Sequence, residues 1–316
     1  MIAKNCLFVI FVGLTLGILP GCSPVSSGTA TQPRISSFDA PKVNGRIKSV
    51  DITESSGIAA SKCQTDVFWT HNDSGDGAFV FAINSSGDAL GTWKVPNAQN
   101  IDWEDVSVFK DKNGKCFIYI GEIGDNKAKR PQHSIICVAE PSVGPATANS
   151  SRSKPLMTPK ADSVQYRYPD SKQDAETMMV HPKTGDIYVV TKRVSGPAGV
   201  YRIKPDFGSA STQIAENIGE ISVPAIPNGF LTGGDISPDG ERLVLCDYTQ
   251  AYEYSLPDGK ADFVKIWSQT PETIDLGKRK GGEAVCYSID GTSIFATSEG
   301  KNSPVIEVRR KAEPPA

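Results

Sequence analysis

The sequence predicts an all-β protein, a single β-propeller of five blades, preceded by an export signal. Short apolar strands bounded by turns such as Pro238-Asp-Gly run through a chain that contains 29 Gly and 22 Pro. Few stretches have helical periodicity. A unit of strand, turn and strand also recurs five times at intervals typical of propeller blades.

Each repeat opens with an acidic or Gly-Gly segment at the start of a short apolar strand. A turn and a second, more hydrophobic strand follow, and a third strand comes after most of these pairs. Closure of such units into a ring leaves only short strand edges exposed. The five first strands begin Glu54-Ser-Ser-Gly-Ile-Ala, Asp102-Trp-Glu-Asp-Val-Ser, Asp174-Ala-Glu-Thr-Met-Met, Gly233-Gly-Asp-Ile-Ser-Pro and Gly281-Gly-Glu-Ala-Val-Cys.

The second repeat is longer than the others because it contains residues 141–162, a stretch rich in Ser, Pro and Ala. We interpret this stretch as a loop inserted in the second blade. The last repeat ends after its third strand, near Arg310, so residues 44–51 are expected to supply the missing outer strand and close the ring. A sixth blade hidden in the insertion and a pair of stacked β-sandwiches are the structural alternatives.

The first 22 residues resemble a bacterial lipoprotein signal. Lys4 provides a positive start, residues 7–19 are mostly apolar, and the run Leu19-Pro20-Gly21-Cys22 ends in the cysteine that would be acylated. Residues 1–21 are therefore expected to be the signal peptide and residues 22–42 a lipidated, flexible tether. The propeller is expected over residues 43–310 and a disordered tail over 311–316. An ordinary cleaved signal peptide is the alternative.

The rest of the chain has no second hydrophobic segment, and the net charge of -3 of the whole sequence gives no sign of nucleic-acid binding. We expect an exported monomer, held by its lipid on the periplasmic side of the outer membrane. Its partners would be that membrane and a small-molecule or protein ligand.

Five cysteines lie in the predicted propeller, and an odd number leaves at least one thiol unpaired. An oxidising compartment permits disulfides. Two pairs of cysteines are candidates for disulfides, because one pair falls in corresponding turns and the other in neighbouring strands. For both pairs, the alternative is that the cysteines are small buried residues with free thiols. The two pairs are Cys63 with Cys116 and Cys246 with Cys286, and Cys137 is the fifth cysteine.

Antiparallel order places the starts of the first strands and the ends of the second strands at one rim around the propeller axis. Polar residues are concentrated at these positions. We predict that they form an acidic mouth of the central channel, which binds a small polar ligand or a partner. The candidate ligand-binding residues are Glu54, His71, Asp73, Asp102, Glu104, Asp125, Asn126, Asp174, Glu176, Lys192, Arg193, Asp235, Asp247 and Glu283.

Carboxylates that face one cavity repel one another, which raises their pKa values unless a cation intervenes. Calcium prefers carboxylate and amide oxygens, so a calcium site is predicted at Asp102, Glu104 and Asp125. Glu104 is the best single catalytic candidate, because Asp102 and Asp105 flank it in the most acidic motif. For about half of the acids, the alternative role is to fix the backbone of their own blade.

Three functions remain open. The first is a binding module, and the second is a hydrolase that cleaves a phosphoester or a glycoside with calcium or with paired carboxylates. The third is a structural lipoprotein, since one fold hosts many functions. The common nucleophile, zinc and phosphate-loop motifs are absent, and His71 is the only histidine expected at the mouth.

Six motifs resemble those of a family of uncharacterised bacterial propeller proteins. The resemblance covers roughly residues 54–300 and implies the propeller fold and export, but it brings no established activity. The motifs are Ser55-Ser-Gly-Ile-Ala-Ala-Ser, Trp69-Thr-His-Asn-Asp-Ser-Gly, Asp102-Trp-Glu-Asp-Val, Gly121-Glu-Ile-Gly-Asp-Asn, Asp174-Ala-Glu-Thr and Gly233-Gly-Asp-Ile-Ser-Pro-Asp-Gly.

Overall fold

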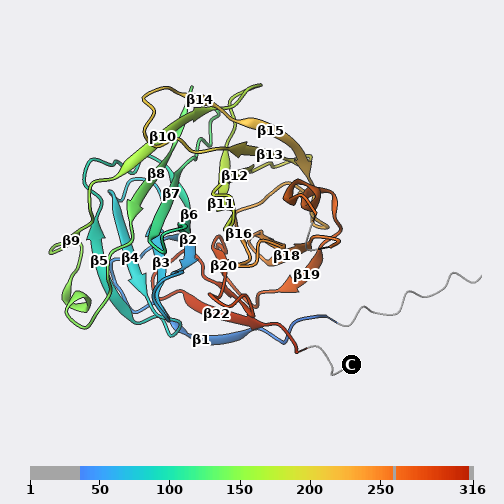
Figure 1. The fold of residues 1–316 in the computed structure, drawn as a ribbon. Helices are drawn as coiled ribbons and strands as arrows, with labels where there is room; N and C mark the ends of the chain where they lie inside the picture. Colours follow the sequence, from blue (N-terminus) through green and yellow to red (C-terminus); the bar gives the residue numbers. More distant parts are fainter. Residues whose placement is uncertain (1–35, 259–260, 313–316) are drawn as a thin grey trace, which may run out of the picture. The chain divides into compact units, whose positions relative to one another are not determined.

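The computed structural model describes residues 36–258 and 261–312. This part of the chain forms five sheets, antiparallel except for one short outer strand in each of two of them, arranged as blades around a central axis (Figure 1). The predicted five-bladed β-propeller is confirmed. The predicted signal peptide, Cys22 and most of the tether lie outside the described residues, as does the end of the predicted tail. None of the described helices is long and apolar enough to cross a membrane.

The blades follow one another along the chain. In blades 1 to 4 the innermost strand comes first in the chain, and in blade 5 the innermost strand is β20, because the outermost strand β1 comes from the N-terminal part. Blade 1 contains β2 (Ser55–Ala60), β3 (Phe68–Asn72), β4 (Phe79–Ile83), β5 (Ala89–Lys94) and β9 (Leu156–Met157). Blade 2 contains β6 (Trp103–Lys110), β7 (Cys116–Glu122), β8 (His133–Ala139), β10 (Asp162–Arg167) and β14 (Gln213–Ile214). Blade 3 contains β11 (Ala175–Val180), β12 (Ile187–Thr191), β13 (Ala198–Ile203) and β15 (Glu216–Ile221).

Blade 4 contains β16 (Gly233–Ile236), β17 (Arg242–Cys246), β18 (Gln250–Ser255) and β19 (Glu272–Asp275). Blade 5 contains β20 (Val285–Tyr287), β21 (Ser293–Ala296), β22 (Pro304–Arg309) and β1 (Lys42–Arg46). Two short 3-10 helices, η1 (Thr147–Asn149) and η2 (Phe263–Ser268), lie in the connections.

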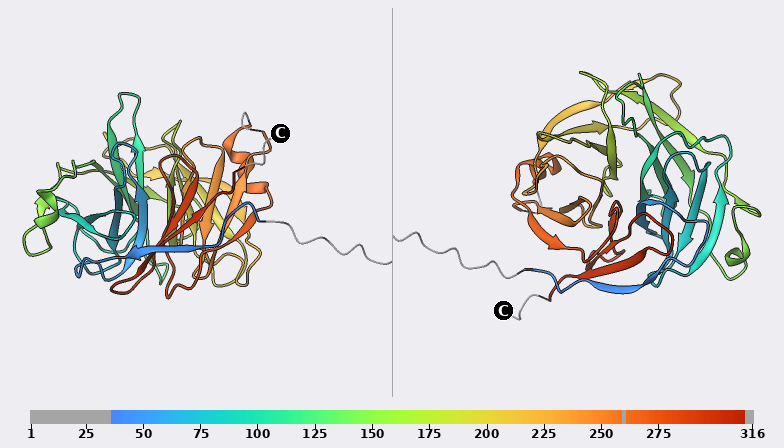
Figure 2. Two further views of the ribbon diagram at one scale, coloured as in Figure 1. Left: turned by 90° about the horizontal axis from the view of Figure 1, so that it is seen from below. Right: turned by 180° about the vertical axis from the view of Figure 1, so that it is seen from behind.

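The N-terminal strand β1 closes the ring, as predicted. It pairs antiparallel with β22, with Lys42 opposite Glu307, and the views in Figure 2 show this strand running along the outside of blade 5. The strand comprises Lys42–Arg46, whereas residues 44–51 were expected. The difference arises because Ile47 lies in the core between blades 5 and 1 and continues the chain inward.

The insertion in the second repeat does not form a sixth blade in the described part of the chain. It extends back to blade 1, where β9 pairs parallel with β5, and Trp93 lies opposite Leu156. A second excursion, from blade 3, places β14 parallel to β10 at Tyr166 and Arg167. The long connections therefore cover the outer edges of neighbouring blades, which protects strand edges that would otherwise be open.

The hydrophobic core consists of five clusters, one between each pair of successive blades. The innermost strands approach closely, and small residues make this possible. At Gly57, for example, a Cβ atom would lie 2.7 Å from the backbone nitrogen of Val106 in the next blade. A close approach of two backbones is one reason for glycine within a strand.

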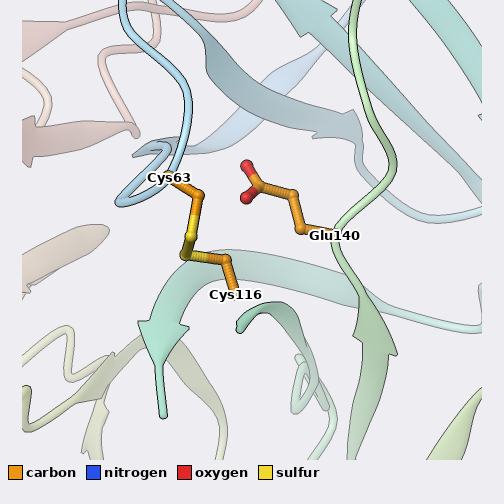
Figure 3. Close-up of side chains that lie close together, drawn as sticks. All are labelled: Cys63, Cys116 and Glu140. Carbon is orange, nitrogen blue, oxygen red and sulfur yellow. A yellow bond between two sulfur atoms is a disulfide. The ribbon is translucent and has the colours of Figure 1, made fainter. Parts of the chain in front are cut away.

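Cys63 and Cys116 form a disulfide that joins the turn after β2 to the start of β7, with 6.2 Å between the Cα atoms (Figure 3). This predicted pair is confirmed. The pairing of Cys246 with Cys286 is wrong, because the two side chains lie in different inter-blade clusters on opposite sides of blade 5. Both are buried free thiols, as is Cys137.

Candidate functional site

Carboxylates from two blades meet at one end of the central channel. Asp73 follows β3 of blade 1, and Asp102 and Glu104 lie at the start of β6 in blade 2. Each of the three offers one oxygen atom, and these atoms all lie within 4.8 Å of one another. Glu104 is buried, while the other two are partly accessible. A group of oxygen ligands of this kind suits a hard divalent cation such as calcium.

A β-bulge positions the central acid. In β6, Trp103 pairs with Glu122 and Asp105 pairs with Gly121, which leaves Glu104 as the extra residue. The inner strand of blade 3 has the same irregularity, with Glu176 as its extra residue. Bulges turn a side chain out of the regular alternation and are common next to functional sites. The bulge therefore accounts for two acids that face the channel mouth.

Gly124 preserves the space beside these carboxylates. A Cβ atom at this position would lie 2.6 Å from Oδ2 of Asp102 and closer still to the carboxylate of Glu104. Gly124 belongs to the motif Gly121-Glu-Ile-Gly-Asp-Asn, but it was not among the predicted site residues. The close approach of the loop after β7 to the two acids explains why only glycine fits there.

Burial and mutual repulsion raise the pKa values of the mouth carboxyls. The pKa of Asp102 is raised to about 6 by burial and by the charges of Asp73 and Glu122. The pKa of Glu104 lies well above its usual range, because the group is buried and Glu176 and Asp73 are near. Unless a cation is bound, the site therefore holds protons at a pH where free carboxyls would be ionised.

The other side of the mouth is formed by Glu283 and Glu176. Burial, with the charges of Glu176 and Glu299, raises the pKa of Glu283 to about 9. Burial also raises the pKa of Glu176 to about 7, although the Lys192 ammonium opposes this shift. Oε2 of Glu176 is buried and has no hydrogen-bond partner. Glu54 is exposed at the rim, and its pKa is raised by partial removal of its carboxyl from water and by the charge of Asp73.

Lys192 is the cation closest to these acids. Its ammonium forms an ion pair with Oε1 of Glu176 and lies 4.7 Å from the ring centroid of Phe230 and 5.4 Å from that of Tyr248. Burial lowers the pKa of Lys192, but Glu176 outweighs burial and the pKa is raised. Blade 4 and the connection that leads into it therefore contribute aromatic rings to the mouth. Phe230 was not among the predicted site residues.

Other predicted residues hold the rim loops in place. Asp174 accepts a hydrogen bond of 2.8 Å from the backbone of Asp125, and Asp125 accepts one of 2.6 Å from the backbone of Arg130. Asn126 and Arg193 are exposed on the rim. Of the predicted metal ligands Asp102, Glu104 and Asp125, the first two group with Asp73, whereas the carboxylate of Asp125 accepts a hydrogen bond from loop backbone.

Three predicted residues are buried in the packing or occupied by hydrogen bonds within the fold. His71 is completely buried and packs edge-on against Trp103 at 5.8 Å, and burial lowers its pKa. Asp247 is occupied by its own turn, where it accepts hydrogen bonds from Thr249, Gln250 and Tyr252. These contacts are structural, as expected for part of the set.

Asp235 is the third of these residues. Its carboxylate accepts backbone hydrogen bonds of 2.8 Å from Ile236 and 2.9 Å from Tyr287 of the next blade. It borders a cavity with hairpin-turn residues such as Pro182 and Pro238, which are at the opposite end of the channel. In its place at the mouth, blade 4 has Gly233 and Gly234.

The fold and the site together define a five-bladed β-propeller with an acidic channel mouth. No protein family and no curated protein matches the chain. Among solved structures, the chain is similar to a gluconolactonase from Xanthomonas campestris, with 13% sequence identity and a TM-score of 0.45. That match covers 86% of this chain and 95% of the gluconolactonase chain. We draw no argument about activity from this distant likeness.

Proposed function

We propose that the acidic mouth binds a divalent cation, calcium by preference, and through it a small polar ligand. The proposal is carried by the three carboxylates of Asp73, Asp102 and Glu104, whose oxygens lie within 4.8 Å of one another. Calcium takes six to eight oxygen ligands in flexible geometry. Three protein carboxylates would therefore leave positions for water and for oxygens of the ligand.

Two further features support a bound cation. Gly124 keeps open the space beside the carboxylates of Asp102 and Glu104. In addition, Oε2 of Glu176 is buried without a hydrogen-bond partner, and among the charged neighbours this side chain raises the pKa of Glu104 most, after burial itself. Buried polar atoms are normally paired, so an unpaired one beside an acidic cluster is consistent with a ligand that completes it.

We expect calcium to bind the full-length chain and to raise its melting temperature, and Glu104→Gln to weaken binding at least about tenfold. The reason is that the substitution removes one charged ligand while preserving the shape of the side chain. Isothermal titration calorimetry and thermal unfolding, both after removal of metal by a chelator, measure the two effects. Glu220→Gln, an exposed acid on β15, is the matched control. Unchanged affinity in Glu104→Gln would contradict the site.

A hydrolase is the second candidate, and the protonation of Glu283 favours it. In the absence of a cation, the pKa of this carboxyl is raised to about 9, so it carries a proton at neutral pH and would act as a general acid from the side of the mouth opposite the proposed cation site. The same calcium-loaded samples should be incubated with phosphoester and glycoside substrates. Turnover that is lost in Glu283→Gln while calcium binding remains would establish the hydrolase. If calcium binds but no substrate is turned over, the protein is a binding module. If calcium does not bind and no substrate is turned over, the protein is structural.

We also propose that the protein is exported and anchored through Cys22 to the outer membrane, on its periplasmic side. The disulfide between Cys63 and Cys116 supports export, because such bonds persist mainly in oxidising compartments. Labelled palmitate should be incorporated into the full-length chain in a bacterial host. Cys22→Ser should abolish the label and release the protein from the membrane fraction, whereas Cys6→Ser should change neither. Label retained in Cys22→Ser would refute the anchor.

A further inference from the structure

A cleft of about 660 Å³ lies beside the acidic mouth, between blades 1 and 2. One wall is the face of the sheet formed by β8 and β10. Ser163 is paired with Ile136 and Gln165 with Ser134, so these four side chains project from the same face. The facing wall is the loop of residues 97–101, which connects the two blades. A volume of this size is typical of sites for small organic ligands.

Both ends of the cleft are held by side-chain contacts. At one end, the amide of Asn97 donates to the carbonyl of Ala161 at 3.0 Å and accepts from its backbone nitrogen at 3.2 Å. At the other end, the guanidinium of Arg130 forms an ion pair of 2.8 Å with Glu122. The cleft is therefore bounded by paired groups, not by loose side chains.

The chemistry of the lining favours a neutral ligand rich in hydroxyl groups. The charge of Arg130 is compensated by Glu122, and Asp162 is the one other charged lining residue, whose carboxylate would accept hydrogen bonds from hydroxyl groups and repel anions; the rest of the polar lining is amide and hydroxyl. These groups both donate and accept hydrogen bonds, as sugar hydroxyls do. Ile101, which is 58% exposed, and Pro131 provide apolar contacts suited to the C–H groups of a sugar ring. The amide and hydroxyl lining consists of Asn97, Gln99, Gln132, Ser134, Ser163 and Gln165.

The cleft and the acidic mouth share one edge. The carboxylate of Glu122 accepts hydrogen bonds of 2.9 Å from the backbone of Ile101 and 3.1 Å from that of Asp102. Ile101 lines the cleft, and the next residue, Asp102, belongs to the predicted cation site. An extended ligand in the cleft would therefore have one end at the acidic mouth.

We propose that this cleft binds a neutral oligosaccharide, with one end of the ligand directed toward the acidic mouth. This inference rests on the proposed function only for the end of the oligosaccharide that lies at the acidic mouth. The residues that line the cleft do not belong to the proposed cation site. A peptide that adds a strand to a sheet needs a free backbone edge. Here the polar groups project from the face of the sheet, which favours a sugar over such a peptide.

The test is binding of neutral tetrasaccharides of glucose, xylose, mannose and N-acetylglucosamine to the full-length chain, measured by calorimetry with and without calcium. At least one member should bind. Ser163→Trp, which fills the cleft, and the double substitution Gln132→Ala and Gln165→Ala should each weaken that binding at least about tenfold. Lys160→Trp places the same bulky ring on an exposed position outside the cleft and should leave affinity unchanged. Melting temperatures verify that each variant is folded.

Absence of binding to every tetrasaccharide at millimolar concentration would overturn the proposal, as would equal binding by Ser163→Trp and the native chain. Binding of unstructured peptides in place of sugars would also overturn it. Calcium affinity is measured on the same samples. Sugar binding without calcium binding would refute the cation site alone, and calcium binding without sugar binding would refute the oligosaccharide cleft alone.

Discussion

In the absence of divalent cations, the protein is expected to lose about 3 kcal/mol of unfolding free energy between pH 7 and pH 9. The mouth carboxyls cause this loss, because burial and neighbouring charges raise the pKa of Glu283 to about 9. In the unfolded chain, the same group is ionised throughout this range. The folded state therefore binds more protons than the unfolded state, and stability must fall as pH rises toward 9.

Between pH 7 and pH 9, the histidines contribute little to the change in stability. Burial lowers the pKa values of His71 and His133, so their effect on stability lies below about pH 6.5 and has the opposite sign. Lys192, whose pKa is raised, stays charged throughout the range. Burial also raises the pKa values of the free thiols of Cys137, Cys246 and Cys286, so these groups add a slope of the same sign, and the comparison with Glu283→Gln isolates the contribution of the mouth carboxyl.

Calcium should reverse the effect, because a cation favours the ionised carboxylates and relieves their repulsion. Urea unfolding at pH 7, 8 and 9, in chelator and in millimolar calcium, measures both slopes. Glu283→Gln should reduce the slope in chelator, since the amide does not titrate. Glu220→Gln, on the outside of blade 3, should leave the slope unchanged. Constant or rising stability between pH 7 and pH 9 in chelator would contradict the proposed electrostatics of the mouth.

The repeat made the fold predictable, because five copies of one unit share the same order of strands and turns. Ring closure by an N-terminal strand followed from the incomplete last repeat. The course of the insertion could not be predicted, because β9 consists of only Leu156 and Met157 and pairs with a strand of another blade. Two residues have too little pattern to specify a partner about 60 residues away in sequence.

Part of the site was predicted from the sequence. The β-bulges decide which of the aligned acids face the mouth, and the sequence did not reveal them. Glu104, Glu176 and Asp235 align in the repeat, but only the first two are extra residues in a bulge. In β16, the pairing from Gly233 to Ile236 has no shift of register. Asp235 consequently takes the structural place that Asp105 has in blade 2, below the mouth. An alignment of the repeats cannot show that one strand contains an extra residue relative to its paired strand when the flanking residues match.

Asp105→Ala is expected to destabilise the protein by about 4 kcal/mol, although Asp105 does not face the mouth. Its buried carboxylate accepts hydrogen bonds of 2.8 Å from the backbone of Val106 and 3.0 Å from that of Met178 in blade 3. The substitution would leave both N–H groups unsatisfied between two blades. An unsatisfied buried donor costs about 1–3 kcal/mol, and the vacated space adds to this cost.

Urea unfolding at pH 7 with saturating calcium measures this loss without a contribution from the titrating mouth. Asp105→Asn keeps one acceptor oxygen and should cost less than half as much as Asp105→Ala. Asp206→Ala, an exposed aspartate after β13, is the control and should change stability by less than about 0.5 kcal/mol. A loss below about 1 kcal/mol for Asp105→Ala would mean that the blades do not depend on this carboxylate. In that case, the apolar clusters between the blades would suffice to hold blade 2 against blade 3.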